Sequence, residues 1–209
     1  MPRLTRFLLR STHLDGPYNL YNQALREYGW LRSYRAQAPI SALGEPLPWY
    51  TYAAIAFLEE RLPRDTRVFE YGSGFSTLWY ARRVASVTSV ESSPEWAERM
   101  AAQAGGSQIV TRTDIDAYRN EILAYEEPFD LVAIDGLDRP GCARLALERL
   151  SPSGVFVWDN SDREEFGLAM SATLKPFGFR ELPFPGLGPT NPYVWRTSII
   201  YRSDNLLGI

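Results

Sequence analysis

The sequence predicts an α/β domain with a doubly wound, mostly parallel sheet, and three features support this. Residues 67–91 have the pattern of strand, glycine turn, helix and second strand. The apolar runs at 131–134 and 155–158 do not alternate with polar residues, as expected of strands buried on both faces. Strand and helix patterns also alternate across 67–158, which is typical of parallel strands joined by helical crossovers.

Length and composition indicate one globular domain. The chain has 209 residues, a length sufficient to bury a full sheet core. Its composition, 45% hydrophobic and 22% charged, is ordinary for a globular protein. The net charge of −3 gives no electrostatic reason to expect nucleic acid or a membrane as partner. Cys142 is the only cysteine, so no intrachain disulfide can form. The apolar residues 7–9 are too few for a signal peptide, and we predict a cytoplasmic protein.

The chain divides into an extension, residues 1–47, and a main domain, residues 48–209. We expect the extension to be helical, with its aromatic residues packed on the core, or, nearest residue 48, to form a lid over the site. The domain opens with a predicted helix at 50–62, ended by Pro63. A strand at 67–71, the glycine turn, a helix at 76–83 and a strand at 87–90 follow.

The second half continues the alternation. Ser93 and Pro94 are typical of a helix start, and Gly105 with Gly106 of the turn that closes that helix. Strands are predicted at 109–110, 129–134 and 155–158, with a helix at 140–150 and a turn at 151–154. Residues 177–182 and 193–201 supply the last two of seven strands, joined by a loop at 185–192.

The glycine turn reads Glu-Tyr-Gly-Ser-Gly-Phe-Ser and carries the first functional signal. Its glycines allow a ligand to approach the main chain, and the following helix points free N–H groups at the same place. A dinucleotide fingerprint needs a third glycine where Thr77 stands, so the fit to NAD is poor. The turn resembles the first motif of the class I S-adenosylmethionine-dependent methyltransferases, acid-x-G-x-G-x-G, with Ser76 in place of the third glycine.

The resemblance implies a Rossmann-like methyltransferase fold whose last strand is antiparallel, with S-adenosylmethionine as cofactor. Glu91 ends the second strand, where a carboxylate can accept both ribose hydroxyls. Asp114 lies where this family often contacts the adenine. The expected cofactor-binding residues are Glu70, Gly72, Ser73, Gly74, Ser76, Thr77, Glu91, Asp114 and Asp135.

Acidic residues also end two later strands. Asp135 follows one buried strand, and Asp159 with Asn160 follows another. The ends of neighbouring strands lie ~4.8 Å apart, so these oxygen ligands can share a divalent ion such as Mg²⁺. The set resembles the metal ligands of catechol-type O-methyltransferases, which carry a catalytic lysine where this chain has Arg139.

An arginine cannot act as a base near neutral pH. The sequence therefore leaves two mechanisms open: one with a metal on Asp135, Asp159 and Asn160, and one in which Asp135, Asp138 or Asp159 takes the proton after burial raises its pKa. A purely structural cap and turn at Asp159 and Asn160 is the third alternative.

The phrases EYGSGFSTLW, SVESSPEW, FDLVAIDG and GVFVWDNS resemble bacterial O-methyltransferase-like proteins over 48–202. The predicted function is methyl transfer to a hydroxyl of a small molecule, such as a sugar or a phenol. The catalytic candidates are Asp135, Asp159 and Arg139, and the substrate-binding candidates are Trp49, Tyr50, Asn160 and Tyr193. The alternatives are a catalytically silent cofactor-binding protein and an NAD-dependent oxidoreductase. The oligomeric state is open, with a homodimer as one option.

Overall fold

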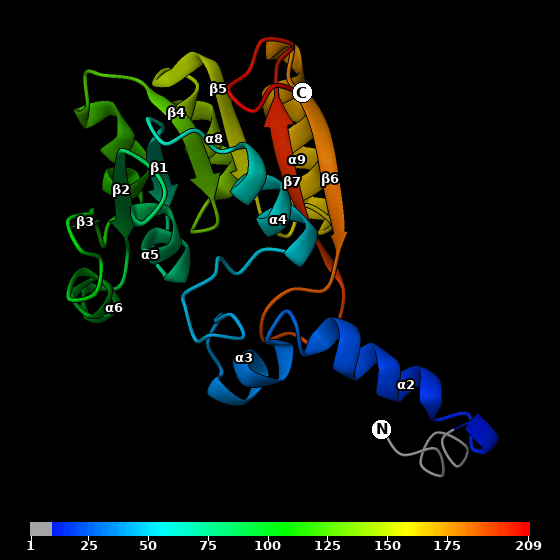
Figure 1. Cartoon of the computed structure of the whole chain (residues 1–209). Helices are drawn as coiled ribbons and strands as arrows, with labels where there is room; N and C mark the ends of the chain where they lie inside the picture. Colours follow the sequence, from blue (N-terminus) through cyan, green and yellow to red (C-terminus); the bar gives the residue numbers. More distant parts are fainter. Residues whose placement is uncertain (1–9) are drawn as a thin grey trace.

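In the computed structural model, residues 10–209 are described, so the predicted absence of a signal peptide at 7–9 concerns residues outside this range. The centre is a seven-stranded sheet of order β3-β2-β1-β4-β5-β7-β6 (Figure 1). The strands are β1 (Arg67–Tyr71), β2 (Ser86–Glu91), β3 (Gln108–Thr111), β4 (Phe129–Ile134), β5 (Leu150–Trp158), β6 (Arg180–Gly186) and β7 (Trp195–Tyr201).

The first five strands are parallel, and β7 runs antiparallel to both β5 and β6. The predicted α/β class, the seven strands and the antiparallel last strand are therefore confirmed. The order also reverses between β1 and β4, and open α/β sheets bind ligands beyond the carboxyl ends of their strands at such a reversal.

Helices cover both faces of the sheet. On one face, α4 (Tyr52–Arg61) and α5 (Phe75–Ala81) bury a core around Leu58, Trp79 and Tyr80. On the other, α7 (Ile115–Asn120), α8 (Arg139–Ala146) and α9 (Glu164–Leu174) bury a core that includes Trp158. The remaining helix, α6 (Pro94–Ala101), lies beside β2 and β3. Short 3₁₀ turns follow α7 at Glu121–Ala124 and α9 at Lys175–Phe177.

The helix predicted at 140–150 ends at Ala146, and Leu150 already belongs to β5. Two further predicted boundaries were wrong for identifiable reasons. The predicted turn at 151–154 belongs to β5, because Leu150 pairs with Phe129 and the register then shifts before Leu131. The sixth strand begins at Arg180 and continues through Pro183 and Pro185. Proline is tolerated there because β6 is an edge strand, where a missing N–H need not break the ladder.

The N-terminal arm, residues 10–47, is helical in part and projects from the domain (Figure 1). It contains α2 (Asp15–Asn19), a π-helical turn (Leu20–Leu25) and α3 (Trp30–Ala36). Tyr28 stacks on Tyr52 of α4 with ring centroids 4.4 Å apart, and Trp30 Nε1 donates to the carbonyl of Asn191 at 2.9 Å. These two residues tie the arm to the domain.

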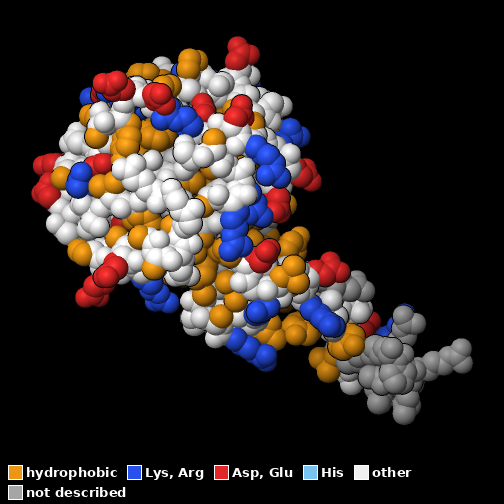
Figure 2. Space-filling model, turned by 60° about the vertical axis from the view of Figure 1, so that its left-hand side comes forward, with side chains coloured by type: hydrophobic (Ala, Val, Ile, Leu, Met, Phe, Trp, Pro, Cys, Tyr) orange, Lys and Arg blue, Asp and Glu red, His pale blue; other side chains and the backbone are white. Residues whose placement is uncertain are grey.

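The other aromatic residues of the arm do not follow the expected packing on the core. Figure 2 shows hydrophobic side chains gathered where the arm meets the body, bordered by basic side chains. The large exposed apolar residues of the arm are Leu14, Tyr18, Leu20, Tyr21, Tyr28, Tyr34 and Leu43. Among residues 10–209, no helix is both long and apolar enough to cross a bilayer.

Candidate active site at the carboxyl edge of the sheet

The glycine turn leads from β1 into α5. Gly72 has a φ of +96°, a conformation that glycine adopts at little cost, and its N–H donates to Val90 of β2 at 2.9 Å. A Cβ at this position would lie 3.3 Å from Cα of Gly136, in the segment after β4. A side chain at residue 72 would be strained by this φ and would also press on the segment after β4. Gly74 ends the turn, with its N–H donating to Thr77 Oγ1 at 3.0 Å.

Glu91 holds this turn from the end of β2. Its Oε2 accepts hydrogen bonds from the backbone N–H and the hydroxyl of Ser73, at 2.9 and 3.1 Å. Its Oε1 accepts from the backbone N–H groups of Ser92 and Ser93, at 2.8 and 2.9 Å. The carboxylate is buried, so these donors supply the stabilisation that water would otherwise give. Glu91 thus fixes the glycine turn to the end of β2.

Glu70 lies beneath the turn. It is buried, and its carboxylate accepts from Ser89 Oγ of β2 at 2.9 Å. Burial raises the pKa of Glu70 to about 7, although hydrogen bonds from Thr77, Ser76 and Ser89 oppose the rise. This acid supports the turn from below and does not line the cavity above it.

A cavity of about 160 Å³ lies over the turn. Of the expected cofactor-binding residues, Gly72, Ser73, Gly74, Ser76 and Asp135 line it. A Cβ at Gly74 would meet nothing closer than Ser76 Oγ at 4.0 Å, so the space above the turn is open to a ligand. A glycine cradle with an acid on the neighbouring strand suits a nucleoside cofactor.

Residues that sequence reasoning missed complete this cavity. Trp96 of α6 lines it and donates from Nε1 to the carbonyl of Ser73 at 2.7 Å. Phe75 borders it at the start of α5, and Gln37 and Pro39 reach it from the N-terminal arm. Trp96 could have been suspected from its place in the first turn after β2. The arm residues carry no local signal, because only the tertiary fold brings them here.

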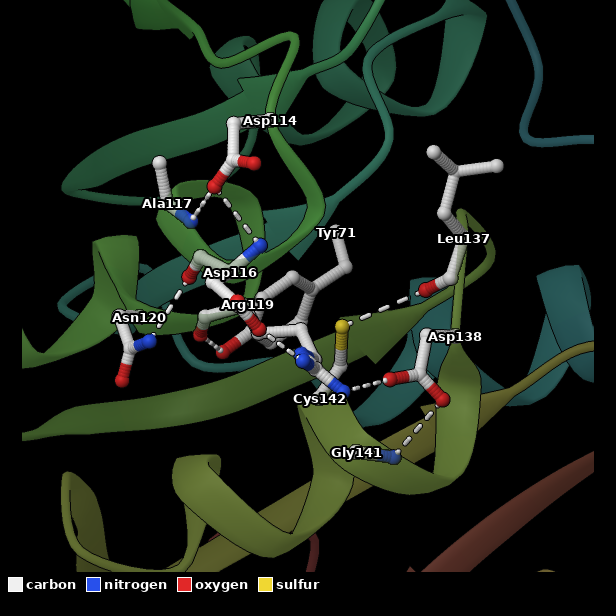
Figure 3. Close-up of polar contacts among 10 residues, drawn as sticks. All are labelled: Tyr71, Asp114, Asp116, Ala117, Arg119, Asn120, Leu137, Asp138, Gly141 and Cys142. Carbon is white, nitrogen blue, oxygen red and sulfur yellow. Dashed lines mark hydrogen bonds and ion pairs between the residues drawn. The ribbon is translucent and has the colours of Figure 1, made fainter.

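Asp114, expected near the adenine, caps α7. Its Oδ1 accepts from the N–H groups of Asp116 and Ala117, at 3.0 and 2.9 Å (Figure 3). The residue is exposed and does not line the cavity. In this arrangement the carboxylate serves the helix N-terminus, a common use of aspartate.

Asp138 has a comparable structural position. It stands before α8 with a φ of +36°, and Arg119 of α7 donates to its Oδ2 at 2.7 Å (Figure 3). Its Oδ1 accepts from the N–H of Gly141 at 3.4 Å. Arg119 is also paired with Asp116. Because both carboxylate oxygens serve a cap and an ion pair, Asp138 is poorly placed to take a proton from a substrate.

Arg139, Asp135 and Asn160 form a cluster beside the cavity, in which Arg139 is buried and the other two are partly exposed. Arg139 Nη2 donates to Asp135 Oδ1 at 2.9 Å and lies 3.3 Å from Asn160 Oδ1. Its Nη1 donates to the carbonyl oxygen of Asp159, and its guanidinium lies 4.7 Å from the ring centre of Phe166. Burial raises the pKa of Asp135, and the adjacent Arg139 charge opposes the rise.

The carboxylate of Asp159 faces the last strand. Asp135 and Asp159 follow the register pair Ile134 and Trp158, so they are neighbours at the sheet edge as predicted. However, Asp159 Oδ1 accepts from Trp195 Nε1 at 3.0 Å and from Thr197 Oγ1 at 2.5 Å, both on β7. Burial, reinforced by Asp135, raises the pKa of Asp159 to about 8.

The expected metal ligands Asp135, Asp159 and Asn160 therefore do not converge on an open position. A guanidinium stands between Asp135 and Asn160, and the Asp159 carboxylate is bound elsewhere. Within residues 10–209, no group of three or more His, Cys, Asp or Glu side chains is arranged to hold a metal ion. The donor set does not fit a divalent metal.

The expected substrate residues lie in different environments. Trp49 lines the cavity and is 44% exposed, as a residue that contacts a ligand can be. Tyr50 is buried, with its hydroxyl next to that of Tyr80. Asn160, with a φ of +54°, is held by Arg139, and Tyr193 is exposed in the β6–β7 loop. Trp49 and Tyr193 are accessible, whereas Tyr50 belongs to the core.

Sheet order, glycine turn and edge acids together define the class I S-adenosylmethionine-dependent methyltransferase fold. No family model matches the sequence, and no curated protein matches it significantly. Solved structures do. An O-methyltransferase from Bacillus cereus in complex with SAH is 17% identical with a TM-score of 0.59, covering 89% of this chain and 96% of that one.

Two further structures illustrate the range of the fold. Cofactor-bound Rv0187 from MTB is 20% identical, with a TM-score of 0.58 and coverage of 92% of this chain and 97% of that chain. An rRNA methylase from Streptococcus thermophilus is 17% identical, with a TM-score of 0.55 and coverage of 72% and 95%. At these identities the likeness shows the fold, and it includes proteins described as acting on different acceptors.

Proposed function

We propose that this protein is an S-adenosylmethionine-dependent methyltransferase that acts on a hydroxyl oxygen of a small molecule. The observation that carries the proposal is the adjacency of two half-sites at the carboxyl edge of the sheet. The glycine cavity lies over the end of β1 and reaches Asp135, which follows β4. The buried carboxyl of Asp159 follows β5, the neighbour of β4 in the sheet.

The glycine half-site would hold the cofactor. Residues 72–76 provide the cradle, and Glu91, whose carboxylate fixes Ser73, would hold the turn in the shape that the ribose meets. Trp49 and Trp96 border the cavity and would exclude water from it. When bound, S-adenosylmethionine supplies a sulfonium methyl group, and catalysis then depends mainly on alignment and on exclusion of water.

The second half-site would handle the acceptor proton. Trp195 and Thr197 both donate to Oδ1 of Asp159, which leaves Oδ2 as the oxygen that gains a proton. A base whose pKa lies near the working pH is efficient, and burial brings that of Asp159 to about 8. Arg139 is a buried positive charge beside Asp159 and would stabilise an oxyanion formed on the acceptor.

A small acceptor is supported by the charge of the chain. The net charge is −3, and nucleic-acid binding draws most of its affinity from basic side chains that contact phosphates. Basic residues border the N-terminal arm in Figure 2, but acidic side chains are interspersed over the body. A phenol, a sugar or another hydroxyl compound fits this better than rRNA.

Calorimetric titration with S-adenosylhomocysteine, and with NADH as the competing cofactor, tests the first half-site. We expect micromolar binding of the former and none of the latter. Transfer of labelled methyl groups to phenol, catechol, glucose and bulk rRNA then tests the acceptor. Preference for NADH would overturn the cofactor assignment, and transfer to rRNA alone would overturn the acceptor class.

Asp159→Asn tests the second half-site. It keeps the shape of the side chain, so S-adenosylhomocysteine affinity should be nearly unchanged while methyl transfer falls by about 10²–10⁴-fold. Asp204→Asn, on an exposed residue remote from the site, is the matched control. If the Asp159 variant keeps both binding and transfer, the assignment of the base is wrong.

A further inference from the structure

Four oxygen atoms surround the guanidinium of Arg139. Nη2 lies 2.9 Å from Asp135 Oδ1, 3.3 Å from the Asp135 carbonyl and 3.3 Å from Asn160 Oδ1, and Nη1 donates to the Asp159 carbonyl. A carboxylate, an amide and two carbonyls are hard oxygen ligands of the kind that divalent cations take. Here these four oxygen atoms surround the guanidinium cation of Arg139 instead.

A metal ion and this guanidinium cannot share the place. A magnesium ion binds oxygen at roughly 2.1 Å, so an ion bound to Asp135 Oδ1, which lies 2.9 Å from Nη2, would stand within about 5 Å of the guanidinium. Two positive charges this close repel each other, and the repulsion is strong because Arg139 is buried. The Asp159 carboxylate faces β7, where its Oδ1 accepts from Trp195 and Thr197.

Packing shows that Arg139 is built into this position. Its side chain is buried, it starts α8 directly after the Asp138 cap, and it lies over the face of Phe166. A guanidinium remains charged at any working pH and its planar fork suits several fixed acceptors. Burial and these partners fix the conformation of the Arg139 side chain, whereas an arginine on the surface could adopt others.

We propose that the guanidinium of Arg139 is the permanent cation of this site and stands where a divalent metal would otherwise bind Asp135 and Asn160. The site is therefore metal-independent in cofactor and acceptor binding. The inference rests on the proposed methyltransferase function only where it concerns catalysis. Whether Arg139 or a metal ion occupies this position can be measured without any methyl transfer.

Titration with Mn²⁺, followed by the paramagnetic resonance of the free ion, tests the inference. Wild-type protein should bind no stoichiometric Mn²⁺. Arg139→Ala should bind one ion, at least about tenfold more tightly than wild type, because removing the cation leaves the oxygens unpaired. Arg144→Ala, an exposed arginine on the same helix, is the control and should behave as wild type.

Adding Asp135→Asn to the Arg139→Ala variant should abolish the gained site, which would show that the ion occupies the place of the guanidinium. Stoichiometric Mn²⁺ binding by wild type that Asp135→Asn removes would overturn the inference, and so would a folded Arg139→Ala protein without any binding. If circular dichroism shows Arg139→Ala unfolded, Arg139→Gln is judged by the same criteria. Failure to bind S-adenosylhomocysteine would contradict the proposed function and leave the Mn²⁺ result interpretable.

Discussion

The hydroxyl of Thr197 lies 2.5 Å from Oδ1 of Asp159 and donates a hydrogen bond to it. The same hydroxyl accepts from the backbone N–H of Thr51 at 3.0 Å, so its one proton is directed to the carboxylate. A donor with a fixed direction makes Oδ1 an acceptor in both charge states. Thr197 is thus a positioning residue that decides which oxygen of Asp159 titrates.

Thr197→Val tests this role, because valine has nearly the same shape without the hydroxyl. Loss of the hydrogen bond should raise the pKa of Asp159 further, since that bond favours the ionised form. The free energy of unfolding should fall by about 1–3 kcal/mol, because the Thr51 N–H loses its acceptor. Carboxyl NMR titration and urea unfolding measure the two effects. Thr88→Val in β2 is the control, and an unchanged Asp159 titration in the Thr197 variant would contradict the role.

Glu91→Gln tests the link between the glycine turn and cofactor binding. An amide cannot accept on both ends, so at least one set of N–H donors, at Ser73 or at Ser92 and Ser93, loses its partner. We expect S-adenosylhomocysteine affinity to fall by about 10–100-fold, since hydrogen bonds to a charged group contribute about 1.5–3 kcal/mol. Calorimetry measures the change. Glu95→Gln, on an exposed residue of α6, is the control. If Glu91→Gln binds S-adenosylhomocysteine as tightly as wild type, Glu91 has no part in cofactor binding.

The buried acids give stability a defined dependence on pH. Asp159 has its pKa raised from 3.8 to about 8, and Glu70 from 4.5 to about 7, so the folded protein holds protons that the unfolded chain releases. The free energy of unfolding should therefore fall as pH rises from the ordinary value of each group to its raised value, by at most about 1.4 kcal/mol per pH unit for each group. Urea unfolding across this interval measures it.

Asp159→Asn and Glu70→Gln should each reduce the fall of the unfolding free energy with pH. The effect of Asp159→Asn should extend to about pH 8, and that of Glu70→Gln to about pH 7. Methyl transfer should move the other way, increasing as Asp159 loses its proton near pH 8. A wild-type protein that becomes more stable over this interval would show that the two acids are not held protonated by the fold.

Most of the fold could be predicted from sequence because its signals are local. Apolar runs without alternation identify buried strands, and the acids that follow Ile134 and Trp158 were correctly expected at neighbouring strand ends. The boundaries that failed, at Ser151 and Pro183, depend on a register shift and on the edge position of β6. Neither is visible without the partner strands.

The site was harder to predict because side-chain direction is set by tertiary contacts. Asp135 and Asp159 do lie side by side, yet one carboxylate turns to Arg139 and the other to β7. Nothing in the spacing of residues 135–139 indicates that the arginine folds back between its neighbours. Gln37 and Pro39 reach the cavity from the far end of the sequence, again without a local pattern.

The place of β7 in the sheet has a consequence for the order in which the protein is made. The strand inserts between β5 and β6, and it supplies both donors to Asp159 although it is the last strand to be synthesised. The residues of the glycine turn are therefore synthesised well before Asp159 can gain either donor. Loss of the final 15 residues, 195–209, would remove the strand that joins β5 to β6 together with both donors to Asp159.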